Sequence, residues 1–150
     1  MDELRELYQA TILDHNRKPR NFRQPESSDR RAEGYNPICG DQLVVFLDLE
    51  EDRVTDIAFQ GVGCAISVAS ASLMTDFVRG KHLDEIQTEF KRFHEMVTSA
   101  PGTSLDIPSL GKLAVFSGVR EFPVRVKCAT LAWHTLHAAL DGDGGIARTE

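Results

Sequence analysis

Residues 43–59 read LVVFLDLEEDRVTDIAF. Two apolar runs flank an acidic turn at 50–52, and apolar residues alternate along the first run, which is the period of a half-buried strand. The apolar residues of the two runs are Leu43, Val45, Leu47, Leu49, Val54, Ile57 and Phe59. This stretch therefore predicts a β-hairpin at the centre of the fold.

Helical periodicity surrounds the hairpin on both sides. Apolar residues recur three and four apart within residues 4–12, and Pro19 prevents that helix from continuing. After the hairpin, residues 65–79 are rich in small side chains and favour a helix closed by Gly80. Further helices are predicted over 86–97, around 109–117 and over 129–140.

Other segments carry weaker signals. Residues 20–38 are polar and aperiodic, so we expect a long loop or a short edge strand there. Pro123 is expected to keep the residues before Cys128 extended, so that Cys128 opens the last helix. The glycine-containing tail, about 141–150, is expected to be flexible. These elements predict an α+β fold, a small antiparallel sheet with helices packed on one face.

Size and charge limit the classes of function. The 150 residues are 41% hydrophobic and 27% charged, which suits a single domain spanning 1–150. The net charge of -6 argues against binding to nucleic acid or to an anionic membrane. We interpret the one basic cluster as a solvated loop face. It consists of Arg17, Lys18, Arg20, Arg23, Arg30 and Arg31.

The sequence also bears on the compartment. No apolar run approaches the roughly 20 residues that a membrane span needs. The start, Met1-Asp2-Glu3, lacks the basic and apolar regions of a signal peptide. We therefore expect a cytoplasmic protein, with no membrane and no nucleic acid among its partners.

The three cysteines lie at predicted junctions between elements. Cys39 precedes the hairpin, Cys64 follows it, and Cys128 opens the last helix. An odd number of cysteines does not suit a disulfide framework, and a reducing cytosol keeps thiols free. Gly40 and Gly63 lie beside two of them and permit unusual backbone angles. The sulfurs are therefore candidates for metal ligands or reactive groups.

The chemistry of these residues suits zinc, which prefers four tetrahedral ligands including thiolates and carboxylates. Helix N-termini and the nearby Arg125 and Lys127 favour thiolate over thiol and offset the negative charge of such a site. The predicted ligands are Cys39, Asp41, Cys64 and Cys128. Isolated cysteines are also often buried small hydrophobes, and their spacing alone leaves both interpretations open.

Three segments resemble the IscU/NifU-like iron-sulfur cluster assembly family. They read NPICGD at 36–41, GVGCAIS at 61–67 and RVKCATLAW at 125–133. Matches at 14–15, 19–21 and 69–72 extend the likeness over nearly the whole chain. The long interval between the second and third cysteines makes it similar to the SufU type within this family. So does Lys127, which stands where the housekeeping IscU scaffold has a histidine.

This resemblance implies a zinc-dependent sulfur acceptor, a sulfurtransferase-type relay that works with a SufS-type pyridoxal-phosphate cysteine desulfurase. It implies an IscU/NifU N-terminal-like fold whose sheet has three antiparallel strands. Cys39, Asp41, Cys64 and Cys128 would be the zinc ligands, and Cys39 would accept sulfur after a side chain of the desulfurase replaces it on zinc. A downstream cluster-assembly scaffold would receive the sulfur.

Two alternatives remain. The chain could be a scaffold on which an iron-sulfur cluster is assembled and passed to apoproteins, or a binding module whose zinc is purely structural. Lys127 argues against the scaffold. Residues 121–125, EFPVR, also lack the intact Leu-Pro-Pro-Val-Lys motif by which a chaperone recognises the housekeeping scaffold.

Overall fold

The computed structural model describes residues 2–100, 107–141 and 146–148, and the predicted hairpin lies at its centre. The hairpin consists of β2 (Asp41–Glu50) and β3 (Arg53–Val62), joined by a two-residue turn. Glu51 and Asp52 have positive φ angles of 49° and 40°, the conformation that a tight hairpin turn needs. The hairpin prediction is confirmed.

A third antiparallel strand, β1 (Arg30–Asn36), pairs with β2 within the stretch expected to be a loop or edge strand. Its buried positions are occupied by Ala32, Gly34 and Asn36. These side chains are small or polar, so the strand lacks the alternating large apolar residues by which strands are recognised. A Cβ at Gly34 would lie 1.9 Å from Thr135 Oγ1, which shows how closely this strand approaches the last helix.

The sheet has a fourth, short strand in the tail expected to be flexible. β4 (Ile146–Arg148) runs parallel to β1, giving the strand order β3-β2-β1-β4. An edge strand exposes unpaired backbone groups, and pairing with β4 satisfies those of β1. Residues 146–148 of the tail expected to be flexible form this strand, 142–145 and 149–150 lie outside the described residues, and the flexibility of the tail stays a prediction.

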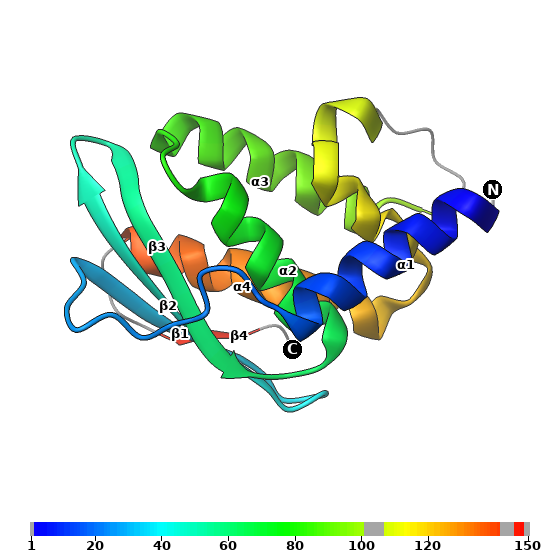
Figure 1. Cartoon of the computed structure of the whole chain (residues 1–150), viewed down its shortest axis with the longest axis horizontal. Helices are drawn as coiled ribbons and strands as arrows, with labels where there is room; N and C mark the ends of the chain where they lie inside the picture. Colours follow the sequence, from blue (N-terminus) through cyan, green and yellow to red (C-terminus); the bar gives the residue numbers. More distant parts are fainter. Residues whose placement is uncertain (1, 101–106, 142–145, 149–150) are drawn as a thin grey trace.

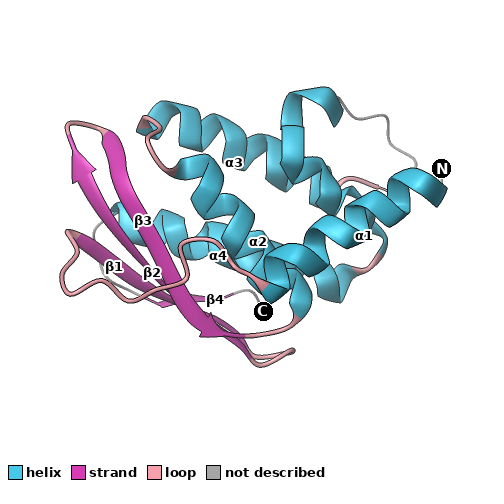
Figure 2. Ribbon diagram, in the orientation of Figure 1, coloured by secondary structure: helices cyan, strands magenta, loops and turns pink. Residues whose placement is uncertain are grey.

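The helices lie on one side of the sheet, as Figures 1 and 2 show. α2 (Ala65–Val78) packs against β3, and α4 (Pro123–Asp141) packs against β1 and β2. One hydrophobic cluster joins the sheet to these helices. The predicted fold class, a three-stranded antiparallel sheet with helices on one face, is confirmed.

The remaining helices enclose this core. α1 (Asp2–Arg17) packs on α2, and α3 (Leu83–Thr98) extends the predicted segment 86–97 at its start. The stretch predicted around 109–117 is the 3₁₀-rich element η1 (Ile107–Glu121), which is kinked at Gly111. None of the helices in the described ranges is long and apolar enough to cross a membrane.

The start of α4 differs from the prediction. Pro123 is its first helical residue, not the end of an extended segment. Proline suits the first position of a helix, because an N–H there would have no acceptor within the helix and because the φ angle of proline is already helical. Cys128 therefore lies in the second turn of α4, not at its N-terminus.

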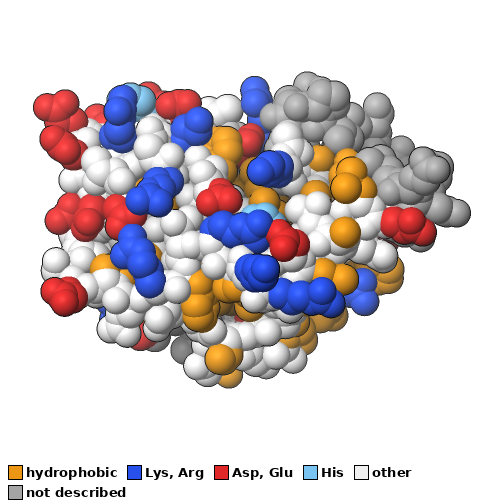
Figure 3. Space-filling view, viewed as in Figure 1, with side chains coloured by type: hydrophobic (Ala, Val, Ile, Leu, Met, Phe, Trp, Pro, Cys, Tyr) orange, Lys and Arg blue, Asp and Glu red, His pale blue; other side chains and the backbone are white. Residues whose placement is uncertain are grey.

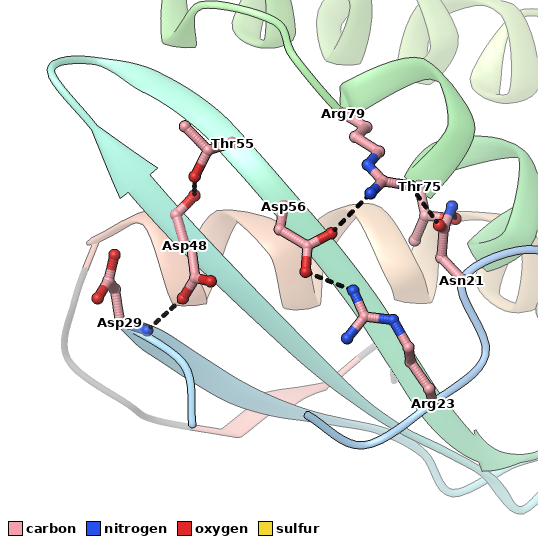
Figure 4. A network of polar contacts seen from close by, with 8 residues as sticks. All are labelled: Asn21, Arg23, Asp29, Asp48, Thr55, Asp56, Thr75 and Arg79. Carbon is pink, nitrogen blue, oxygen red and sulfur yellow. Dashed lines mark hydrogen bonds and ion pairs between the residues drawn. The ribbon is translucent and has the colours of Figure 1, made fainter. Parts of the chain in front are cut away.

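The segment before β1 crosses the outside of β3 and carries much of the basic cluster. Arg23 pairs with Asp56, which also lies 3.4 Å from Arg79, and Figure 4 shows the carboxylate between the two guanidinium groups. Asn21 Nδ2 donates to Thr75 Oγ1 at 3.0 Å and anchors the segment to α2. Figure 3 shows lysines, arginines and acids interspersed on this face, as expected for a solvated surface.

Candidate metal centre

The turn between β1 and β2 presents two of the predicted ligands. Asn36 and Asp41 pair across the strands, so residues 37–40 form the turn and Cys39 lies on it. The Gly40 N–H donates to the carbonyl of Asn36 at 2.9 Å, and Gly40 has a φ of 72°, which favours glycine. The turn holds the side chain of Cys39 exposed at the end of the sheet.

α4 brings Cys128 to the same place from the helical layer. Its side chain is buried, and its Sγ lies 3.4 Å from the Sγ of Cys39. The ligand atoms of Cys39, Asp41 and Cys128 all lie within 4.8 Å of one another. Two thiols and a carboxylate at this spacing fit three vertices of a tetrahedral zinc site, because thiolates and carboxylates are ligands that zinc accepts.

Cys64 lies beside this group without belonging to it. It is the N-cap residue of α2, as the junction argument predicted, and its side chain is exposed. Its backbone N–H donates to Asp41 Oδ1 at 2.9 Å, so its main chain is part of the site. The structure thus brings three of the four predicted ligands together, and the sulfur of Cys64 as the fourth stays a prediction.

Asp41 is fully buried and held at both carboxylate oxygens. Oδ1 accepts from the Cys64 N–H, and Oδ2 accepts from Asn36 Nδ2 at 3.1 Å. The chain needs a glycine beside this carboxylate, because a Cβ at Gly63 would lie 2.8 Å from Asp41 Oδ1 and 2.3 Å from Ser67 Oγ. The carboxylate is therefore a positioned ligand rather than a loosely held one.

The environment of Cys128 contradicts the expectation of an activated thiolate. Burial raises the pKa of the Cys128 thiol strongly, and the nearby Cys39, Cys64 and Asp41 groups raise it further. The helix N-terminus invoked for this residue is not there, since α4 begins five residues earlier. Without metal, Cys128 is a protonated thiol, and it must lose a proton to ligate one.

The two basic residues near Cys128 differ in position. The Arg125 guanidinium lies 4.6 Å from the centre of the Phe122 ring, a cation-π contact at the surface. Lys127 is half-buried and directly precedes Cys128. Neither side chain pairs with Asp41 within the described residues. Their role in offsetting the charge of the site stays a prediction.

Sequence reasoning missed Asn36 as part of this site. It is completely buried, and its Nδ2 donates to Asp41 Oδ2 and, at 3.6 Å, to Cys128 Sγ. A signal was present in the sequence, because a polar residue directly across a hairpin turn from a ligand carboxylate is placed to hydrogen-bond with it. The expectation of a loop or an edge strand over 20–38, with the hairpin beginning at Leu43, concealed that relation.

Exposed apolar side chains lie close in sequence to the predicted ligands. Ile38 directly precedes Cys39, and Val62 lies two residues before Cys64. Phe122 directly precedes α4, and Val124 is the second residue of that helix. Their exposed fractions are 54%, 66%, 47% and 49%, in that order. We name these four residues the apolar rim. Such a rim beside polar ligands is typical of a surface that binds another protein.

A small sheet-and-helix domain with two thiols and a carboxylate gathered at one end defines a class of domains with a candidate metal centre. The NifU-like N terminal domain matches residues 7–141, and the chain belongs to this family. The match spans all four predicted ligands and α4.

Relatives within the family have two kinds of name. The iron-sulfur cluster assembly scaffold protein IscU of Streptococcus pyogenes is 38% identical over 93% of this chain and 86% of its own length. The zinc-dependent sulfurtransferase SufU of Bacillus subtilis is 37% identical over 96% of this chain and 92% of its own. A crystal structure of a putative scaffold protein for the SUF system from Fervidobacterium islandicum superposes with a TM-score of 0.79 at 33% identity. That likeness covers 87% of this chain and 93% of the other.

Proposed function

We propose that this protein is a zinc-dependent sulfur acceptor that takes persulfide sulfur from a cysteine desulfurase for iron-sulfur cluster assembly. One observation carries the proposal: of the two thiols in the Cys39, Asp41 and Cys128 group, Cys39 alone is exposed. A partner can therefore reach one sulfur of the group while the other remains a buried ligand. The name of the Bacillus subtilis relative supports the same chemistry.

The residues that would hold zinc are Cys39, Asp41, Cys64 and Cys128. When bound, zinc keeps its thiolate ligands deprotonated at neutral pH and so supplies a nucleophile that the buried site alone does not. The donor set fits this role, since sulfur ligands favour zinc over the harder cations. Exposed Cys64 completes the set by turning its sulfur toward the group.

The proposed reaction is a thiolate exchange without net oxidation. The Cys39 sulfur attacks the outer sulfur of a persulfide on the desulfurase and forms a new sulfur-sulfur bond. The bond between that outer sulfur and the desulfurase cysteine breaks, and its electron pair leaves on the desulfurase thiolate. Cys39 then carries the persulfide and passes its outer sulfur to a thiol acceptor, the downstream cluster-assembly scaffold, by the same exchange.

The apolar rim supports a protein partner for this step. Ile38 and Val62 flank the two exposed cysteines, and Phe122 and Val124 lie at the start of the helix that carries the third. A SufS-type desulfurase seated on this end would exclude water around the reacting sulfurs. The reaction needs reduced thiols, in agreement with the cytoplasmic location expected from the sequence.

Cluster scaffolding is the second candidate. The Streptococcus pyogenes relative bears the name of a scaffold, and three thiols near one end of a fold could hold a cluster as cargo. Lys127 weighs against it, because an ammonium group does not coordinate metal as an imidazole does.

Desulfurase turnover tests the proposal. Purified SufS-type enzyme is assayed for alanine formed from cysteine, with and without the zinc-loaded protein, and the added sulfur is mapped by mass spectrometry. We expect faster turnover and one added sulfur atom on Cys39. The variants Cys39→Ala and Cys39→His should both abolish stimulation, and the second offers a replacement zinc ligand without a sulfur acceptor.

The assay also separates the alternatives. No stimulation by the zinc-loaded protein would refute the relay. A stable visible chromophore formed from iron and sulfide on the zinc-free protein, with activation of a target apoprotein, would establish the scaffold. Stimulation that survives Cys39→Ala would indicate a binding module with structural zinc.

A further inference from the structure

Asn36 makes an unusual set of contacts at the end of β1. Its side chain is completely buried, and both contacts of its amide nitrogen are made to groups of the site. Nδ2 donates to Asp41 Oδ2 at 3.1 Å and to Cys128 Sγ at 3.6 Å. One amide group thus connects a ligand on the sheet to a ligand on α4.

The amide oxygen shows that this arrangement is not optimised for stability. Asn36 Oδ1 is buried and has no hydrogen-bond partner among the described residues. A buried polar atom without a partner destabilises the folded state. A hydrophobic residue of similar shape would avoid that loss but would remove the donor to the buried Asp41 carboxylate, so the asparagine serves the ligands rather than the packing of the core.

The two donated hydrogen bonds have different effects. Asn36 donates to Oδ2 of Asp41, and the Cys64 N–H donates to Oδ1 of the same carboxylate. The two hydrogen bonds together fix the carboxylate in one orientation. The bond to Cys128 holds its sulfur beside the Asp41 carboxylate, and the same N–H can donate to that sulfur when it ligates metal as a thiolate. It also makes that thiolate a weaker nucleophile, because the N–H withdraws part of its charge.

Cys39 has no such contact with the amide among the described residues, and its side chain is exposed. We infer that Asn36 is a positioning residue that commits Asp41 and Cys128 to holding metal and leaves Cys39 as the sulfur that reacts. This inference rests on the proposed function, and it adds the reason why one thiol of the pair accepts sulfur and the other does not.

Zinc retention is the first test, and it does not depend on a desulfurase. Asn36→Leu keeps the approximate volume of the side chain and removes both donors, and Asn36→Ala removes the volume as well. Zinc transfer to a chromogenic chelator should show affinity lower by about 10–100-fold in both, the usual effect of losing a hydrogen bond to a metal ligand. Cobalt substitution should show altered thiolate-to-metal charge-transfer bands.

Stability of the metal-free protein separates positioning from packing. Asn36→Leu removes the unpaired Oδ1 but also the donor to the buried Asp41 Oδ2, so without metal it should unfold at a lower temperature than wild type. Positioning predicts a loss of zinc affinity in Asn36→Leu that Ser70→Ala does not show. A purely structural role predicts similar losses of zinc affinity in both variants for similar losses of stability. Ser70→Ala is the matched control: it deletes a buried hydrogen bond to the Ala129 carbonyl between α2 and α4 without touching the ligands.

The sulfur position is the second test. After reaction with a desulfurase persulfide, mass spectrometry should find added sulfur on Cys39 in wild type and on both Cys39 and Cys128 in Asn36→Leu. Zinc affinity, cobalt spectrum and sulfur position all unchanged in Asn36→Leu would overturn the inference. If wild type retains zinc and accepts no sulfur, the proposed function fails, while the zinc measurements still decide whether Asn36 positions the ligands.

Discussion

Cys39 and Cys128 carry the same functional group, and their surroundings give them different chemistry. Cys39 lies exposed on a turn, whereas Cys128 is buried in the second turn of α4 with Asn36 beside its sulfur. The two sulfurs are only 3.4 Å apart, in direct contact, yet one is exposed and the other is buried. At the scale of the residue, the site is asymmetric before any partner binds.

Alkylation of the metal-free protein checks this asymmetry. Burial raises the pKa of Cys128, so the thiolate that reacts with iodoacetamide is scarce at neutral pH. We expect Cys39 and Cys64 to be labelled first and Cys128 at least tenfold more slowly, as measured by mass spectrometry of quenched samples. Equal labelling of all three cysteines would contradict the burial of Cys128 in the folded protein.

Gly63 offers a prediction about packing at the site. Gly63→Ala places a Cβ against Asp41 and Ser67, so the carboxylate or the start of α2 must shift. Overpacking of this kind costs about 1–3 kcal/mol of unfolding free energy, measured by chemical denaturation. Zinc affinity should fall as well.

Gly118→Ala is the matched control for that change. Gly118 is exposed, and a Cβ there would meet no atom within 4 Å. The substitution should leave zinc affinity unchanged and the free energy of unfolding within about 0.5 kcal/mol of wild type. Equal effects of the two substitutions would show that the close approach of Gly63 to Asp41 has no consequence.

At the scale of the element, α1 is attached to α2 through a buried histidine. His15 Nδ1 lies 2.7 Å from Ser72 Oγ, and the Arg20 N–H donates to the same hydroxyl at 2.8 Å. Burial, and then the charge of Arg20, lowers the pKa of His15 in the folded protein. Protonation therefore opposes the docking of α1.

The pH dependence follows from that direction. As the pH falls below about 6.5, the ordinary histidine pKa, the imidazole of His15 takes up a proton more readily in the unfolded chain than in the folded protein. The contribution of neutral His15 to the free energy of unfolding is therefore complete above this pH and is lost as the pH falls. His15→Gln should be less stable than wild type at pH 7.5, and the difference should shrink toward pH 5. Denaturant midpoints measure it, and a difference independent of pH would contradict the assignment.

Elements also show what could be predicted from the sequence. The hairpin and α2 were predicted because apolar alternation and a run of small side chains indicate them directly. The sequence does not distinguish a loop from a strand at β1, because Ala32, Gly34 and Asn36 occupy its buried face. It also does not show whether Pro123 ends an extended segment or begins a helix, because proline suits the first position of a helix.

The same limit applies to the candidate site. Cysteines at junctions, with the family motifs, predicted which residues carry the chemistry. Three features of the site depend on how α4 packs against the sheet: the burial of Cys128, the two hydrogen bonds that hold Asp41, and the contacts of Asn36. Local sequence patterns do not predict this packing, because it brings together residues that are far apart in the sequence.

At the scale of the whole molecule, the core consists of apolar side chains, and the cluster that joins sheet and helices includes none of the four predicted ligands. Asp41 accepts hydrogen bonds from Asn36 and from the Cys64 N–H. Removing zinc with a chelator should therefore lower the unfolding temperature by several degrees while the far-UV circular dichroism at 25 °C stays that of a folded protein.

Calorimetry and circular dichroism on the same sample test that expectation. The unfolding temperature should rise again with added zinc, as mass action requires for a ligand that binds the folded state. A chain that loses its helical signal on chelation would instead resemble a zinc finger, and the structural-zinc alternative would gain support.

The separation of Cys39 and Cys128 by 89 positions has a consequence for synthesis of the protein. A ribosome releases the turn between β1 and β2 long before α4 has been made, so a nascent chain exposes two cysteines without their buried partner. If the proposed ligands hold zinc, the metal can be bound with full affinity only after the last helix has docked. Under the proposed function, zinc loading is therefore a late event, and a bound ion indicates that the chain has reached its native topology.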